Sequence, residues 1–145
     1  MTRSVARAVR VPGLVAAAIS VAALLGVARS EVGPHALIAV SQELLRAYNG
    51  QDPQGLHGLL APSLQAKYAV EDLRLMLAHC RALTHDIERF SIPSWGARRF
   101  GFFGVYAETT VFEMILEIDE AEKIVHWVIT DDVMATDQQC AIRGS

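Results

Sequence analysis

The stretch Thr110–Asp132 constrains the fold most, because it has the pattern of two long β-strands joined by a tight acidic turn. In its first half apolar and polar residues alternate, which predicts a strand with one apolar face. The apolar positions are Phe112, Met114, Leu116 and Ile118. The second half is apolar at positions on both faces, which indicates that both faces of that strand are covered. Covering the outer face by a second copy predicts a homodimer.

The turn Glu120–Glu122 decides which residues of the second strand face the interior. If the loop has three residues, Ile118 opposes Ile124, and His126 then shares the interior face. A two- or four-residue loop would shift the register by one residue and turn Trp127 inward instead. The match of Ile118 with Ile124 favours the first register, so His126 is predicted to face the interior.

Residues 1–30 have the three parts of a secretory signal peptide. The parts are a basic start with Arg3, Arg7 and Arg10, the apolar run Leu14–Val27, and the small-x-small site Ala28–Ser30. We expect cleavage after Ser30, which leaves 31–145 as one secreted or periplasmic domain. The alternative is an uncleaved anchor, the only form in which membrane contact is expected. The apolar run is shorter than the roughly 20 residues of a membrane span, which favours cleavage.

The charge of the exported domain excludes some classes of partner. Residues 31–145 keep nine of the thirteen Lys and Arg side chains against sixteen Asp and Glu, a net charge of −7. The sequence has no basic patch, which argues against nucleic acid and anionic membranes as partners. His79, Cys80 and His85 fit no standard zinc spacing, so neither a metal nor a cofactor is predicted.

Two cysteines remain after export, Cys80 and Cys140. An even number of cysteines in an oxidising compartment favours a disulfide, which would tie the C-terminal tail to a core helix. The alternative is that Cys80 is a free, small and buried apolar residue.

The upstream chain predicts helices and then strands, an α+β fold. Helices are expected over 36–49, from Asp52-Pro53 to a limit at Pro62, and over 70–80; strands are expected over 84–92 and 100–108. The tail from Val133 is polar and carries only weak signals.

This order of elements, with two short segments, resembles the nuclear transport factor 2-like superfamily. Leu116–Ile124 is similar to a strand-turn-strand segment common in that superfamily, and Val70–Arg74 is a weaker match at the start of a helix. Glu122 stands where the family usually has glycine, so a non-glycine residue must adopt positive φ there. The resemblance implies a cone, in which N-terminal helices pack on a curved antiparallel sheet. The superfamily includes polyketide cyclases and ketosteroid isomerase.

The resemblance also implies two kinds of function. The first is binding of a small apolar molecule in the cone, or assembly through the sheet. The second is a cofactor-independent isomerase, cyclase or dehydratase, in which His126 is the acid–base group and Tyr106 a hydrogen-bond donor. The residues expected to line the interior are Tyr68, Phe112, Met114, Leu116 and Val128.

Overall fold

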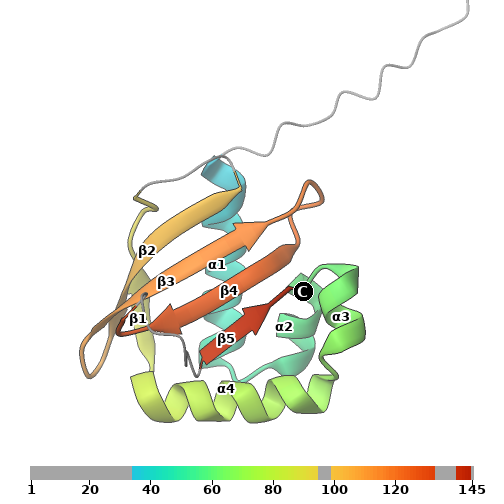
Figure 1. Ribbon diagram of the computed structural model, residues 1–145. Helices are drawn as coiled ribbons and strands as arrows, with labels where there is room; N and C mark the ends of the chain where they lie inside the picture. Colours follow the sequence, from blue (N-terminus) through green and yellow to red (C-terminus); the bar gives the residue numbers. More distant parts are fainter. Residues whose placement is uncertain (1–33, 95–98, 133–139, 145) are drawn as a thin grey trace, which may run out of the picture.

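The computed structural model describes residues 34–94, 99–132 and 140–144, and this part of the chain forms helices followed by a curved antiparallel sheet (Figure 1). The helices are α1 (Pro34–Asn49), α2 (Pro53–Leu59), α3 (Pro62–Lys67) and α4 (Val70–Thr84). The strands are β1 (Ile87–Phe90), β2 (Phe100–Ala107), β3 (Val111–Ile118), β4 (Ile124–Thr130) and β5 (Cys140–Arg143). The predicted α+β class, with helices followed by a curved antiparallel sheet, is confirmed. The predicted signal peptide lies outside the described residues.

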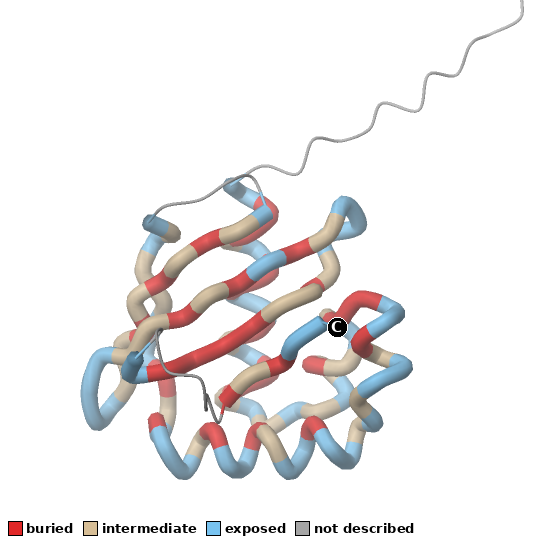
Figure 2. Tube along the Cα trace, in the orientation of Figure 1, coloured by how far each residue is buried: buried red, intermediate tan, exposed pale blue. Residues whose placement is uncertain are grey.

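The five strands pair in chain order, β1-β2-β3-β4-β5. Helix α1 lies behind the sheet in Figure 1, α2 and α3 lie beside β5, and α4 runs along the lower end of the sheet. We call the face toward α1 the inner face and the opposite one the outer face. Buried and half-buried positions alternate along β2 and β3, because successive side chains point to opposite faces (Figure 2). The largest fully buried side chains on the inner face are Phe103, Met114, Leu116 and Trp127.

Two helices differ from the prediction. Pro62 begins α3 instead of ending the previous helix, because proline fits the first turn, where no helical partner exists for its missing N–H. Helix α4 continues past Cys80 to Thr84, because both residues lie on its buried stripe at i and i+4. His85 ends it with φ 59°.

The hairpin has the predicted loop but a different strand register beyond it. Ile118 pairs with Ile124 as predicted, and Glu122 adopts φ 59°. Glu117, however, pairs with His126, so one residue of β4, Val125, is extra. Such a bulge reverses the side-chain alternation of the rest of the strand. The predicted inward orientation of His126 is therefore wrong, and Trp127 faces the interior, where it is fully buried.

Side chains bind the backbone at both edges of the sheet. At the β1 edge, the Asn49 amide donates to the Ile87 carbonyl oxygen at 2.8 Å and accepts from the Ile87 N–H at 3.1 Å. At the β5 edge, Lys67 donates to the Arg143 carbonyl oxygen at 3.0 Å, and the Arg143 N–H donates to the Tyr68 hydroxyl at 3.4 Å. At one residue of each edge strand, Ile87 of β1 and Arg143 of β5, the backbone groups that could pair with another strand are thus occupied.

Candidate functional site

His126 lies in a row of polar side chains on the outer face. The strand pairings place Glu117 of β3 on one side of it and Arg143 of β5 on the other. Its ring is half-buried, and this burial lowers the pKa of His126 below its ordinary value. The negative charge of Glu117 opposes that shift, and the positive charge of Arg143 adds to it. His126 is therefore a surface histidine between two charges and not an acid–base group of the interior.

Tyr106 lies on the same face but far from His126. It pairs with Val111, whereas His126 pairs with Glu117, six residues further along β3. At about 3.3 Å per residue, that separation is about 20 Å. The Arg89 guanidinium stacks on the Tyr106 ring, 3.6 Å from its centroid. Because the two residues lie so far apart, the predicted pair of His126 and Tyr106 is not positioned to act on one substrate atom.

Three of the residues predicted to line the interior lie on the inner face and belong to the packed core. Met114 and Leu116 are fully buried, and Phe112 is half-buried against the same core. Val128 was predicted to join them but points to the outer face, because the bulge shifts β4 by one residue. Tyr68 packs its ring against the core and presents its hydroxyl to the backbone of β5.

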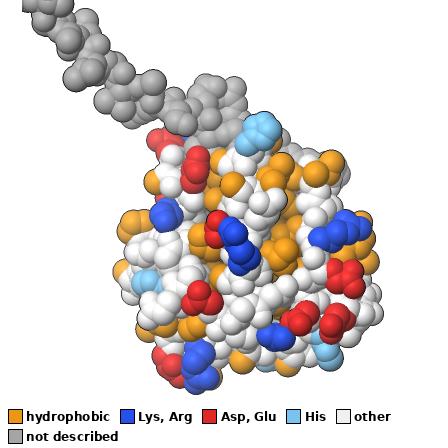
Figure 3. Space-filling model, turned by 180° about the vertical axis from the view of Figure 1, so that it is seen from behind, with side chains coloured by type: hydrophobic (Ala, Val, Ile, Leu, Met, Phe, Trp, Pro, Cys, Tyr) orange, Lys and Arg blue, Asp and Glu red, His pale blue; other side chains and the backbone are white. Residues whose placement is uncertain are grey.

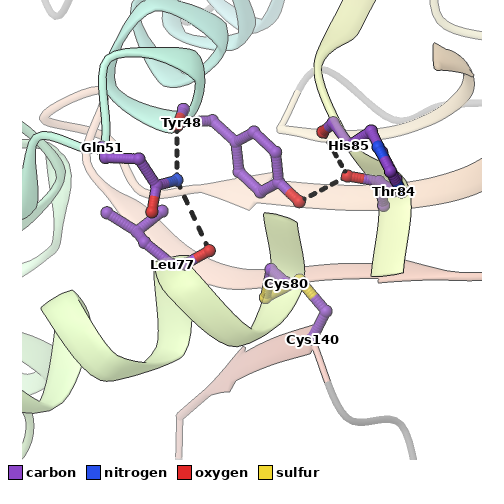
Figure 4. Close-up of a disulfide and its surroundings, with 7 residues drawn as sticks. All are labelled: Tyr48, Gln51, Leu77, Cys80, Thr84, His85 and Cys140. Carbon is purple, nitrogen blue, oxygen red and sulfur yellow. Dashed lines mark hydrogen bonds between the residues drawn. A yellow bond between two sulfur atoms is a disulfide. The ribbon is translucent and has the colours of Figure 1, made fainter. Parts of the chain in front are cut away.

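The interior holds one pair of hydroxyls that the sequence did not single out. The Tyr48 hydroxyl and the Thr84 Oγ1 form a buried hydrogen bond of 2.7 Å, which Figure 4 shows joining α1 to the end of α4. Burial raises the pKa of Tyr48, and the hydrogen bond with Thr84 opposes that rise. The Thr84 hydroxyl also donates to the His85 carbonyl oxygen at 2.9 Å, so the Tyr48 hydroxyl is the donor to Thr84 Oγ1 and both hydroxyl protons have an acceptor, as expected of buried polar groups in a core.

Trp127 occupies the centre of the interior. Its ring meets the Tyr48 ring edge-on, with centroids 6.2 Å apart and an interplanar angle of 82°. Its indole Nε1 has no hydrogen-bond partner in the described part of the chain. A buried donor without a partner lowers stability, so the burial of this large ring must outweigh that loss.

The predicted disulfide is present. Cys80 of α4 and Cys140 of β5 are bonded, with their Cα atoms 5.3 Å apart and both side chains buried (Figure 4). The bond closes a loop of 60 residues and fixes β5, at the edge of the sheet, to α4. The alternative of a free Cys80 is thereby excluded for this structure.

The outer face carries an apolar row beside the polar one. Strand pairing aligns the row in the order Phe102, Ile115, Val128 and Ala141 across β2 to β5. Phe102, Ile115 and Ala141 are half-buried, whereas Val128 is fully buried. We call these four residues the outer apolar row, and Phe100, Glu117, His126 and Arg143, which the same pairings align, the outer polar row.

Two other kinds of site are not found in the parts of the chain that the structure describes. Over 34–94, 99–132 and 140–144, no cluster of three or more His, Cys, Asp or Glu side chains is arranged to hold a metal ion. Within the same ranges, no helix combines the length and the apolar character that crossing a membrane requires.

Comparisons with known proteins give no family assignment. No protein-family model matches the sequence, and neither curated proteins nor solved structures show a significant match. The function therefore has to be inferred from the geometry of this chain.

Proposed function

We propose that this protein is an exported, non-catalytic assembly domain that associates with a second copy through the outer face of its sheet. The observation that supports this most is the outer apolar row, in which Phe102 and Ile115 leave apolar surface at the middle of the sheet. On an isolated antiparallel sheet a solvent-facing surface is usually polar. An apolar strip rimmed by charged residues is typical of an interaction surface.

Other routes to function have less support. The helix-covered side also exposes apolar side chains, but acidic and basic side chains lie among them (Figure 3). At the two sheet edges, side chains are hydrogen-bonded to the backbone of Ile87 and Arg143. These bonds disfavour association in which a strand of another molecule pairs with the edge. A small apolar ligand in the interior would have to displace side chains such as Met114 and Leu116. The alternative enzyme function loses its acid–base group, because His126 lies on the outer face.

Replacing Ile115 by lysine tests the assembly. On the outer side of β3, Ile115 is flanked by Glu113 and Glu117. A lysine at position 115 would lie between two carboxylates, so it should not destabilise the monomer. In the dimer it would place two lysine side chains opposite apolar side chains of the other copy, where water is excluded. We expect the dimer dissociation constant of Ile115→Lys to rise by more than about a hundredfold, measured by sedimentation equilibrium.

Leu75→Lys is the matched control, because Leu75 is 56% exposed on α4 and lies on no part of the sheet. It should leave the dissociation constant unchanged. Circular dichroism and thermal unfolding of both variants would show whether the fold is kept. A wild-type domain that stays monomeric up to millimolar concentration, or a dimer unaffected by Ile115→Lys, would contradict the proposal.

We also propose that the chain is exported and cleaved after Ser30. The support is the composition of residues 1–30, together with the buried Cys80–Cys140 bond, since disulfides persist mainly in oxidising compartments. After expression of the full chain in a bacterial host, N-terminal sequencing should find Glu31 first in the soluble exported fraction. A membrane-bound product that begins at Met1 would support the anchor instead.

The family resemblance stays a prediction. An order of helices followed by a curved antiparallel sheet is compatible with the nuclear transport factor 2-like superfamily. Fold alone does not establish function, so the assembly proposal rests on the outer face and not on this likeness.

A further inference from the structure

Asn49 joins three elements of the fold at the end of α1. Its side-chain amide donates to the Ile87 carbonyl oxygen of β1 at 2.8 Å and accepts from the Ile87 N–H at 3.1 Å. Its backbone carbonyl oxygen accepts from the Arg81 guanidinium of α4 at 3.0 Å. Asn49 is half-buried, and it is the single asparagine of the sequence. This junction uses an uncharged amide as both donor and acceptor.

The residue after Asn49 is held as glycine by the same end of α1. A Cβ atom at Gly50 would lie 2.9 Å from the Arg46 carbonyl oxygen, which is too close for packed atoms. The Gly50 N–H donates to that same oxygen at 2.9 Å. Asparagine is a chemically labile residue, and glycine after it leaves the next backbone nitrogen unhindered by a Cβ atom. The fold therefore keeps a reactive pair of residues at a structural junction.

We propose that Asn49 is a site of spontaneous deamidation, which the folded protein suppresses and the unfolded chain permits. The Gly50 backbone nitrogen forms a bond to Asn49 Cγ, and the bond from Cγ to Nδ2 breaks. The proton of the attacking nitrogen leaves with the amide nitrogen as ammonia. Water then opens the resulting five-membered imide at either carbonyl, which gives aspartate or isoaspartate. One water molecule is consumed and one ammonia molecule released for each asparagine that reacts.

Hydrogen bonds keep the two reacting groups apart in the folded chain. The side chain of Asn49 is held against β1 through both of its polar atoms, and the Gly50 N–H is directed at Arg46 within the last turn of α1. The attack therefore requires the amide to leave Ile87 and the nitrogen to leave Arg46. Only molecules in which this junction has opened can react, so the rate of modification follows the fraction of open molecules.

The product does not fit the junction from which it came. A carboxylate at position 49 has no hydrogen to donate to the Ile87 carbonyl oxygen, and it places a negative charge at the C-terminal end of α1, where the helix dipole disfavours it. The Arg81 guanidinium is already paired with the Asp86 carboxylate at 2.6 Å. The isoaspartate product also lengthens the backbone before Gly50. Reaction of Asn49 thus opposes refolding, which limits the lifetime of a molecule that has unfolded.

The first test compares the rate of modification in the folded and the unfolded protein. The purified protein is incubated near neutral pH, either native or reduced in guanidinium chloride. Intact mass and peptide mapping then locate the mass gain at Asn49, where a hydroxyl replaces the amino group. We expect the unfolded sample to react at least about tenfold faster. Equal rates in the two samples, or an unfolded chain that keeps its amide, would overturn the proposal.

The second test measures what the product does to the fold, by urea unfolding followed by circular dichroism. Asn49→Asp should lower the ratio of folded to unfolded molecules by about tenfold or more, because the Ile87 carbonyl oxygen loses its donor. Gln42→Glu makes the same change from amide to carboxylate on the exposed side of α1, and as the matched control it should stay within about twofold of the wild type. An Asn49→Asp variant as stable as this control would show that modification leaves the fold intact, and would overturn the effect on refolding.

Discussion

Replacing both Cys80 and Cys140 by alanine is expected to lower the free energy of unfolding by about 4 kcal/mol. The two residues are 60 positions apart, and in the chain-entropy account a bond that closes a loop of this length restricts the unfolded chain by about that amount. Alanine is the suitable replacement because both side chains are buried, and a serine hydroxyl there would need a partner. Urea unfolding followed by circular dichroism gives the measurement.

Reductant provides an internal control for this experiment. The wild type should lose a similar amount of stability when it is reduced, whereas the double variant should not respond to reductant. A loss below about 1 kcal/mol would contradict the view that the bond restricts the unfolded chain. If β5 alone were lost without global unfolding, the bond would instead stabilise only β5 and not the whole domain.

Trp127→Ala is expected to destabilise the protein by about 3–5 kcal/mol, because it removes a fully buried ring from the centre of the core. Trp127→Phe should lose less, about 1–2 kcal/mol, since it keeps an aromatic ring against Tyr48 and removes the indole N–H that lacks a partner. If the alanine variant does not fold, the phenylalanine variant still allows the contribution of Trp127 to be measured.

His126→Ala is the matched control, as the neighbouring residue in β4 on the opposite face. It should change the free energy of unfolding of the single chain by less than about 1 kcal/mol, because its ring is only half-buried on the outer face. If His126→Ala were the more destabilising of the two alanine variants, the bulge at Val125 would be wrong. Measurements at low protein concentration keep any association from contributing.

The sequence predicted the hairpin well up to its turn and failed just beyond it. The pairing of Ile118 with Ile124 follows from loop length and from the alternation of β3, and both signals are present in the sequence. The bulge at Val125 left no signal, because β4 is apolar on both faces and a shift by one residue keeps apolar side chains inside. His126 was misplaced for that reason.

The other features of the fold differ in how far the sequence could predict them. The Cys80–Cys140 bond was predictable from the even cysteine count and the expected compartment. The Tyr48–Thr84 hydrogen bond joins residues 36 positions apart, and nothing local distinguishes it from two unrelated side chains. The helix α3 was missed because Pro62 is equally suited to end one helix and to begin the next.

The occupied sheet edges have a consequence for how the protein behaves at high concentration. An open edge strand lets a sheet grow by one molecule after another, which is the route to fibrils. Here the Asn49 side chain is hydrogen-bonded to the backbone of Ile87 at one edge. The side chains of Lys67 and Tyr68 are hydrogen-bonded to the backbone of Arg143 at the other. The pairing proposed for the outer face would likewise end at two copies, because each copy has one such face. The occupied backbone groups at Ile87 and Arg143 therefore disfavour growth of the sheet strand by strand.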